Sequence, residues 1–259
     1  MDLGIAGRKA IVCASSRGLG RASAMRLAEA GCEVTINGLD PKRLENTAEE
    51  IRKATKAKVN AVAADVGTAE GQAKLFAACP EPDILITNNA GPPFRELREL
   101  DRQKMIDGVT GNMIVPIELI QKVIEPMQKR KFGRIVNITS GTVKSPLIGL
   151  DLSSGARAGL TAFLAGVARS VAQHNVTINF MLPGPFDTDR LRHNNEITAK
   201  KQGITVEQAT ANRAASVPAK RLGNPDEFGA ACAFLCSSHA GFITGQNLLM
   251  DGGIFPGAF

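Results

Sequence analysis

The sequence predicts an α/β fold: a doubly wound parallel sheet of about seven strands, helices on both faces, and one domain over residues 1–259. Short, nearly continuous apolar and β-branched segments alternate with longer helical patterns, which is typical of a buried parallel sheet. A glycine-rich turn joins the first expected strand to the first expected helix. The 259 residues, of which 44% are hydrophobic, are enough to bury one large core.

The expected elements follow from runs of β-branched residues, from helical periodicity and from capping residues. The expected strands are Lys9–Ala14, Glu33–Asn37, Val59–Ala63, Asp83–Thr87, Arg134–Ile138, Thr177–Met181 and Asn247–Leu249. The expected helices are Gly20–Ala30, Lys42–Thr55, Gly71–Ala78, Met105–Lys129, Ala156–Gln173 and Pro225–Cys236. Gly31 suits the end of the first helix, and Asp40-Pro41 suits the start of the second.

A long polar segment, residues 187–218, is expected to be irregular and to act as a substrate lid. Loops of this length within a domain are usually functional or mobile.

Composition excludes several function classes. There is no Tyr and no Trp, and all 11 aromatic residues are Phe, so no mechanism here uses a tyrosine. The net charge is +6, but the 31 basic residues are dispersed along the chain and mixed with 25 acidic residues, which argues against nucleic-acid binding. No segment approaches the ~20 apolar residues of a membrane helix. The five Cys form no CxxC pair and the three His show no ligand spacing, so we expect no metal and a reducing, cytoplasmic location.

A candidate phosphate-binding turn follows the first strand. Backbone N–H groups and the positive end of a helix at such a turn can bind a pyrophosphate, which predicts a Rossmann-type dinucleotide site. The candidate residues are Ala14, Ser15, Ser16, Arg17, Gly18, Leu19 and Gly20.

The end of the second strand favours NADP over NAD. An NAD site usually has an acidic residue here to bind the ribose 2′-hydroxyl, but Gly38 and Leu39 occupy the tip. Arg17 and Lys42 lie nearby in the sequence and suit a 2′-phosphate. Asp40 is close enough to keep NAD as the alternative.

Several motifs in order resemble the short-chain dehydrogenase/reductase family, in particular its 3-oxoacyl-(acyl carrier protein) reductase-like members. The resemblance covers nearly the whole chain. The motifs are the turn Cys13–Gly20, Asp65-Val66, Asn88-Asn89-Ala90-Gly91, Gly133–Ser140, Pro183–Thr188 and Asp251-Gly252-Gly253. Cys13 and Ala14 replace the Thr-Gly that opens the turn in the family.

The resemblance implies site residues and partners. Asn112 and Ser140 match the family's active-site asparagine and serine. Further cofactor contacts are implied for Asp65, Val66, Asn89, Ala90, Gly91, Pro183, Gly184, Phe186 and Thr188. The resemblance also implies a small-molecule substrate and a homodimer or homotetramer.

The resemblance fails at the catalytic Tyr and Lys of the family. Thirteen residues after Ser140 stands Ser153, and four further on stands Arg157. An aliphatic hydroxyl is far less acidic than a phenol, and Arg stays protonated, so the usual proton relay is lost. Arg157 keeps the ability to bind ribose hydroxyls or an anion. Ser153 and Arg157 therefore join Asn112 and Ser140 as catalytic candidates, with Arg157 also a cofactor contact.

Three functions remain open. The first is a reductase of a 3-oxoacyl-like carbonyl or small ketone, in which Ser153 assisted by Arg157, a water or Lys144 supplies the proton. The second is a catalytically inactive nucleotide-binding sensor or partner subunit, and the third is a purely structural protein. Residues expected to wall the substrate pocket are Pro92, Pro93, Phe94, Leu147, Ile148 and Leu191, with Arg190, Arg192 and His193 as candidates to meet an anionic group.

Overall fold

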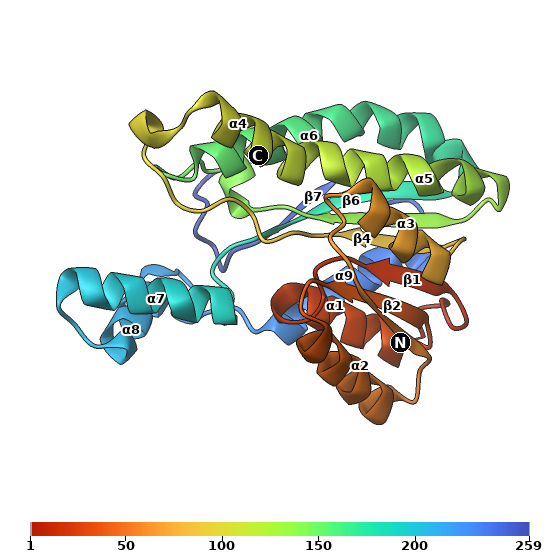
Figure 1. The fold of residues 1–259 in the computed structure, drawn as a ribbon, viewed down its shortest axis with the longest axis horizontal. Coiled ribbons are helices and arrows are strands. Elements are labelled where there is room, and N and C mark those ends of the chain that lie inside the picture. Colours follow the sequence, from red (N-terminus) through yellow and green to blue (C-terminus); the bar gives the residue numbers. More distant parts are fainter. Residues whose placement is uncertain (1, 259) are drawn as a thin grey trace.

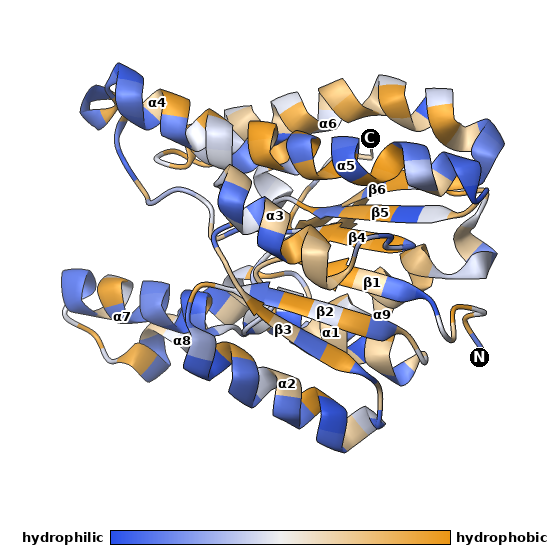
Figure 2. Ribbon diagram, turned by 45° about the vertical axis from the view of Figure 1, so that its right-hand side comes forward, coloured by the Kyte–Doolittle hydropathy of each residue, from blue (hydrophilic) through white to orange (hydrophobic). Residues whose placement is uncertain are grey.

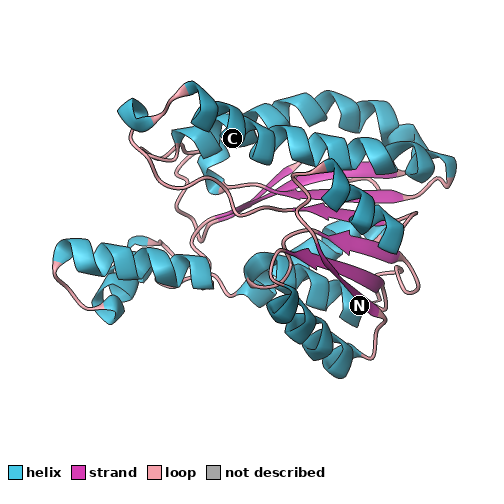
Figure 3. Cartoon of the chain, viewed as in Figure 1, coloured by secondary structure: helices cyan, strands magenta, loops and turns pink. Residues whose placement is uncertain are grey.

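The computed structural model describes residues 2–258 and contains one sheet of seven parallel strands. The strands lie in the order β3-β2-β1-β4-β5-β6-β7. Figure 3 shows the strands as one twisted sheet flanked by helices. Their bounds are β1 Lys9–Val12, β2 Glu33–Gly38, β3 Val59–Ala63, β4 Ile84–Thr87, β5 Gly133–Ile138, β6 Val176–Pro183 and β7 Asn247–Met250. The predicted α/β class and parallel sheet are confirmed.

Helices cover both faces of the sheet (Figure 1). On one face lie α1 (Gly18–Glu29), α2 (Pro41–Thr55) and α9 (Pro225–Cys236). On the other lie α3 (Ala69–Ala78), α5 (Val115–Lys129) and α6 (Asp151–Val171). Apolar colours concentrate on the central strands and on the helix faces turned toward them (Figure 2). Every residue of β5 is buried, as expected for a strand covered on both sides.

The strand order places a switch point beside β1. Strand β1 pairs with β2 on one side and with β4 on the other, both in parallel. The connections after β1 and after β4 therefore diverge, which opens a crevice at the carboxyl ends of these strands. The glycine-rich turn and the candidate residues after β4 lie at this edge.

The expected helix Met105–Lys129 is wrong as one continuous element. It is divided into α4 (Arg102–Val109), a π-helical turn (Thr110–Ile114) and α5. Pro116 gives the physical reason, because it has no N–H to donate to the carbonyl four residues before it, that of Asn112. The interruption therefore falls at the candidate asparagine, and π-turns within helices are frequent at functional sites.

The expectation of an irregular segment at 187–218 is also wrong. The segment folds into a hairpin of α7 (Asp189–Gln202) and α8 (Val206–Ser216), which projects from the sheet in Figure 1. The hydroxyls of Thr188 and Thr205 cap the two helices, and Gly203 ends α7 in the left-handed conformation. The hairpin buries few apolar residues, so its sequence shows no clear helical stripe.

Two further features bear on the predicted function classes. No helix within residues 2–258 is long and apolar enough to cross a membrane. The five cysteines are unpaired and buried.

Candidate functional site

The turn between β1 and α1 leaves donors available for an anion. Helix α1 has no side-chain cap and no acidic residue in its first turn. By contrast, α2, α3 and α4 are capped by the side chains of Asp40, Thr68 and Asp101. The first N–H groups of α1 are thus the ones that an external phosphate would satisfy. Only glycine fits at position 20, since a Cβ there would lie 2.9 Å from the Ser15 Cα.

Ser15 and Ala14 have structural parts in this turn. The buried Ser15 hydroxyl donates to the Val12 carbonyl at 2.6 Å and accepts from the Asn37 N–H at 3.0 Å. Its side chain therefore fixes the turn, and its own N–H is also used, because it donates to the Asn37 carbonyl at 2.7 Å. Ala14 has φ +45°, in the left-handed region that favours glycine, so its difficulty is backbone strain more than crowding.

The tip of β2 carries no free acid. Gly38 is buried and Leu39 is 73% exposed. The Asp40 carboxylate accepts from the Arg43 N–H at 3.1 Å as the cap of α2. Exposed Lys42 lies beside it. Arg17 Nη1 is 3.7 Å from Oδ2 of Asp189. Both acids, Asp40 and Asp189, are therefore engaged, and no free carboxylate stands at this tip.

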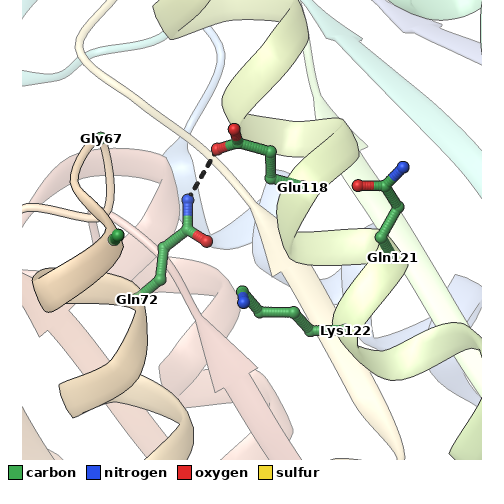
Figure 4. A pocket seen from close by; sticks show the side chains of 6 residues that line it. Gly67, Gln72, Glu118, Gln121 and Lys122 are labelled. Atoms are coloured by element: carbon green, nitrogen blue, oxygen red, sulfur yellow. Dashed lines mark hydrogen bonds between the residues drawn. The ribbon is translucent and has the colours of Figure 1, made fainter.

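Asp65 and Val66 lie beyond β3, at the start of the connection to α3. The Asp65 carboxylate accepts from the Gly67 N–H at 2.8 Å, and the Val66 carbonyl accepts from Gln72 Nε2 at 3.1 Å. Next to them is an open pocket of about 380 Å³, where Gln72 also donates to Glu118 at 2.8 Å (Figure 4). Its lining residues are Gly67, Ala69, Gln72, Glu118, Gln121 and Lys122. None of them is a candidate site residue.

Ser140 begins a short 3₁₀ turn at the end of β5. Its Oγ accepts from the Thr142 N–H at 3.2 Å and from the Thr142 hydroxyl at 3.0 Å. Among residues 2–258 nothing accepts the hydroxyl hydrogen of Ser140, so this hydrogen is available for a substrate oxygen. The next residue, Gly141, packs against the Pro183 carbonyl: a Cβ there would lie 3.3 Å from that oxygen. Ser140 and the Pro183-Gly184 segment are therefore neighbours.

Ser153 and Arg157 form a buried pair in α6. The Arg157 Nε donates to Ser153 Oγ at 3.2 Å. Arg157 is 6% exposed and Ser153 is 8% exposed. Nη1 donates to the Ile138 carbonyl at 2.9 Å and Nη2 to Asn89 Oδ1 at 2.8 Å. Burial, with a smaller contribution from the charge of Arg190, lowers the pKa of Arg157 to about 10. The guanidinium is therefore still charged at neutral pH.

Asn89, Asn112 and Arg157 line one small cavity. Asn89 also donates to the carbonyl of Gly111, which ties the end of β4 to the π-turn. Asn112 Nδ2 donates to the Gly108 carbonyl at 2.9 Å, whereas its buried Oδ1 has no partner within residues 2–258. The cavity lining is Thr87, Asn88, Asn89, Asn112, Pro116, Ile138, Arg157 and Leu160. A buried amide oxygen without a donor indicates a position for a water or a ligand group.

The candidates in the segment after β6, among them Gly184, Phe186 and Thr188, have different structural roles. The Phe186 ring packs edge-to-face on Phe228 at 5.4 Å, so it belongs to the core and only its backbone lies toward the crevice. The Thr188 hydroxyl accepts from the Leu191 N–H at 3.4 Å as the cap of α7. Gly184 must be glycine, because a Cβ there would lie 2.8 Å from the Asp251 Cβ.

The connections after β4 and β5 hold the exposed rim of the site. Ala90 is exposed, and Gly91 has φ +70°. Phe94 and Ile148 are 69% and 91% exposed, in line with an apolar wall open to a ligand. Lys144 has its Nζ 5.9 Å from the Phe255 ring centroid.

Two asparagines that hold the turn in place were not among the candidates. Asn37 donates to the Val62 and Ala64 carbonyls at 3.0 and 2.9 Å, and Asn88 Nδ2 donates to the Ala14 carbonyl at 3.2 Å. The available signal was a polar residue in a strand of otherwise apolar or β-branched residues, since such a residue needs partners when buried.

Comparison with known proteins gives long, full-length matches. Residues 13–254 match the family model described as enoyl-(acyl carrier protein) reductase. The NADPH-dependent reductase BacG of Bacillus subtilis is 31% identical, over 95% of this chain and 97% of its own length. The 3-oxoacyl-(acyl carrier protein) reductase FabG of Aquifex aeolicus is 32% identical, over 98% and 100%. The crystal structure of YwfH, an NADPH-dependent reductase involved in bacilysin biosynthesis, aligns with a TM-score of 0.91 at 30% identity, covering 97% of this chain and 100% of its own.

Proposed function

Because this chain belongs to the short-chain dehydrogenase/reductase family, we propose that it is an NADP-dependent reductase that acts on a carbonyl group through an altered proton relay. The observation that carries the proposal is the buried hydrogen bond from Arg157 Nε to Ser153 Oγ at 3.2 Å. It joins a positive charge to a hydroxyl at the positions where the family has Lys and Tyr.

The geometry of the crevice fits the cofactor. The uncapped N-terminus of α1 and the backbone of residues 16–20 would bind the pyrophosphate, since the N–H groups of Ala14 and Ser15 already donate to Asn37. Arg17, with Lys42 and the absence of an acid at Gly38-Leu39, supports a 2′-phosphate and hence NADP. Asp65 and Val66 would lie at the adenine, Asn89 to Gly91 at the riboses, and the segment Pro183 to Thr188 at the nicotinamide. Bound NADPH would supply the hydride.

Ser140 and Ser153 would act on the substrate oxygen. Each has a hydroxyl hydrogen with no acceptor among the described residues, so both can donate to an oxygen that becomes negative as the carbonyl carbon is reduced. Ser153 would pass its proton to that oxygen and take another from solvent. The Arg157 N–H on Ser153 Oγ stabilises the negative charge left on this atom. Asn112 lines the same small cavity as Arg157, and its buried Oδ1 would accept a hydrogen bond from a ligand group or a water there.

Cofactor titration and substrate turnover test the proposal in sequence. We expect nicotinamide fluorescence to report micromolar NADPH binding with weaker NADH binding. With NADPH bound, a panel of carbonyl compounds should then reveal turnover. Tight NADPH binding with no turnover across the panel would instead support the sensor or partner-subunit function. Failure of both nucleotides to bind at millimolar concentration would leave only the structural function.

A matched pair of variants tests the altered relay itself. Ser153→Tyr with Arg157→Lys should restore a phenol-based relay, so the pH dependence of turnover should change to that of a titrating tyrosine. Ser153→Tyr alone is the control, since Arg157 stays in place. An identical pH profile in the wild type and the double variant would contradict the assignment of these two residues.

We further propose that residues 187–218 form a lid over the substrate, and that the chain works as a homodimer or homotetramer in the cytoplasm. Exposed apolar side chains on α4 and α6, among them Met105, Ile106 and Phe163, support an assembly surface. Light scattering with size-exclusion chromatography would give the mass in solution, and a purely monomeric mass would overturn the oligomer.

A further inference from the structure

Two arginine side chains converge at Gly91. A Cβ built on this glycine would lie 3.1 Å from Arg190 Nη1 and 3.3 Å from Arg157 Nη2. Both guanidinium groups therefore border the same small space above the Gly91 backbone, at the end of β4. Arg157 reaches it from α6 and Arg190 from α7.

Neither positive charge has an acidic partner among residues 2–258. The acceptors of Arg157 are a hydroxyl, a backbone carbonyl and an amide oxygen, and Arg190 reaches only the Pro92 carbonyl at 3.5 Å. The nearby acids are engaged elsewhere: Arg192 lies 3.0 Å from Asp187 and 3.2 Å from Asp189. Arg157 is 6% exposed, so its uncompensated charge is costly, and the exposed Arg190 adds a second cation beside it. The lowered pKa of Arg157, partly caused by Arg190, reflects this proximity.

We propose that Arg157 and Arg190 together bind a carboxylate of the substrate, so that the substrate is an oxo acid. This inference rests on the proposed reductase function and names its substrate class. A guanidinium has five N–H donors, and Arg157 uses three of them, which leaves two for a ligand. Because its Nε is bonded to Ser153, a carboxylate on Arg157 places the carbonyl of the same small molecule near the hydroxyl groups. A neutral ketone or an acyl thioester offers no such anion.

A phosphate of the cofactor is the other source of anionic oxygen. The uncapped start of α1 and Arg17 already supply a phosphate site beside β1. Arg157, in contrast, contacts Ser153 and the small cavity of Asn112. The hydrogen bond from Arg157 to Ser153 favours the substrate carboxylate, whereas Arg190 also adjoins the cofactor side, because the preceding residue, Asp189, lies 3.7 Å from Arg17.

Paired substrates test the proposal on the holoprotein. With saturating NADPH, kcat/KM is measured for 4-methyl-2-oxopentanoate and for its methyl ester, which lacks the charge. We expect the acid to be strongly preferred, and Arg190→Gln to reduce this preference by roughly tenfold or more, mainly through KM. Lys200→Gln is the matched control, because Lys200 is an exposed cation in the last turn of the same helix, and it should keep the preference.

Binding of a non-reactive dianion separates the possible failures. Oxalate is titrated into the NADPH-bound protein by calorimetry. Oxalate binding that Arg190→Gln weakens, without turnover of either substrate, would retain the anion site and reject the reductase function. An Arg190→Gln variant with weaker NADPH binding and an unchanged acid-to-ester ratio would assign the arginine pair to the cofactor and overturn the proposal. Absence of oxalate binding together with equal turnover of acid and ester would also overturn it.

Discussion

The β1–α1 turn and the first turns of α6 both depart from the family pattern, but the departures differ in kind. In the turn, Ala14 stands where the family has glycine, and the backbone keeps its left-handed conformation at φ +45°. Donors in this turn are backbone N–H groups, which do not depend on the side chain. In α6, Ser153 and Arg157 lie in a regular helix, but the chemistry proposed there belongs to the side chains. A substitution is therefore absorbed in the first region and, in the proposed mechanism, alters the proton relay in the second.

The largest expected effect concerns the residues that would contact the substrate. Ser140→Ala removes a hydroxyl whose hydrogen is available to the substrate oxygen, and its loss should reduce kcat roughly 100-fold. NADPH affinity should stay unchanged, because Ser140 lies away from the phosphate turn. Single-turnover kinetics and a fluorescence titration measure the two quantities. An unaffected rate would remove Ser140 from the mechanism and leave Ser153 as the only hydroxyl on the substrate oxygen.

Substitutions in the cofactor site should change the affinity for the cofactor, not the rate of turnover. Arg17→Ala should weaken NADPH binding roughly tenfold while leaving NADH binding nearly unchanged, because a charged contact to the 2′-phosphate is lost. The titration is repeated with Lys42→Ala, which changes a second exposed cation close to the same tip. If NADH binding falls equally in Arg17→Ala, then Arg17 contributes to the turn or to the Asp189 contact and does not select NADP.

A smaller effect should distinguish strain from crowding at Ala14. Ala14→Gly relieves a left-handed conformation, which should raise the free energy of unfolding by about 1 kcal/mol. Lys56, which has φ +63° at the end of α2, offers a control substitution, Lys56→Gly, far from the cofactor. Both should stabilise the protein in a urea titration, and neither should alter NADPH binding, since the donors of the turn are backbone N–H groups. A destabilised Ala14→Gly would mean that the methyl group packs favourably.

The same contrast explains what could be predicted from the sequence. Strand and helix order and the phosphate turn follow from local patterns, and the resemblance to the family located Ser153 and Arg157. The π-turn at Asn112 was missed because it arises from the missing N–H of Pro116 within an otherwise helical pattern. The α7–α8 hairpin was missed because its helices bury little apolar surface and depend on caps such as Thr188. The convergence of Arg157 and Arg190 was hidden because it joins residues that are brought together only by the tertiary fold.

The smallest expected effect is a shift in the pH dependence of turnover when Arg190, which lies next to Arg157, is substituted. The pKa of Arg157 is lowered to about 10, so the charged form is present at neutral pH and is lost as the pH rises through that value. Turnover that requires charged Arg157 should therefore decline near pH 10, whereas the folded state itself gains stability there, because the buried charge that opposes folding is removed. The positive charge of Arg190 is one cause of the lowered pKa, so Arg190→Gln should move the declining limb of the pH–rate profile to higher pH by less than about one unit. Lys200→Gln should leave the limb in place, since that lysine lies in the last turn of α7. A limb that stays fixed in Arg190→Gln would show that burial alone sets the pKa, and would separate the guanidinium of Arg190 from that of Arg157 in the working enzyme.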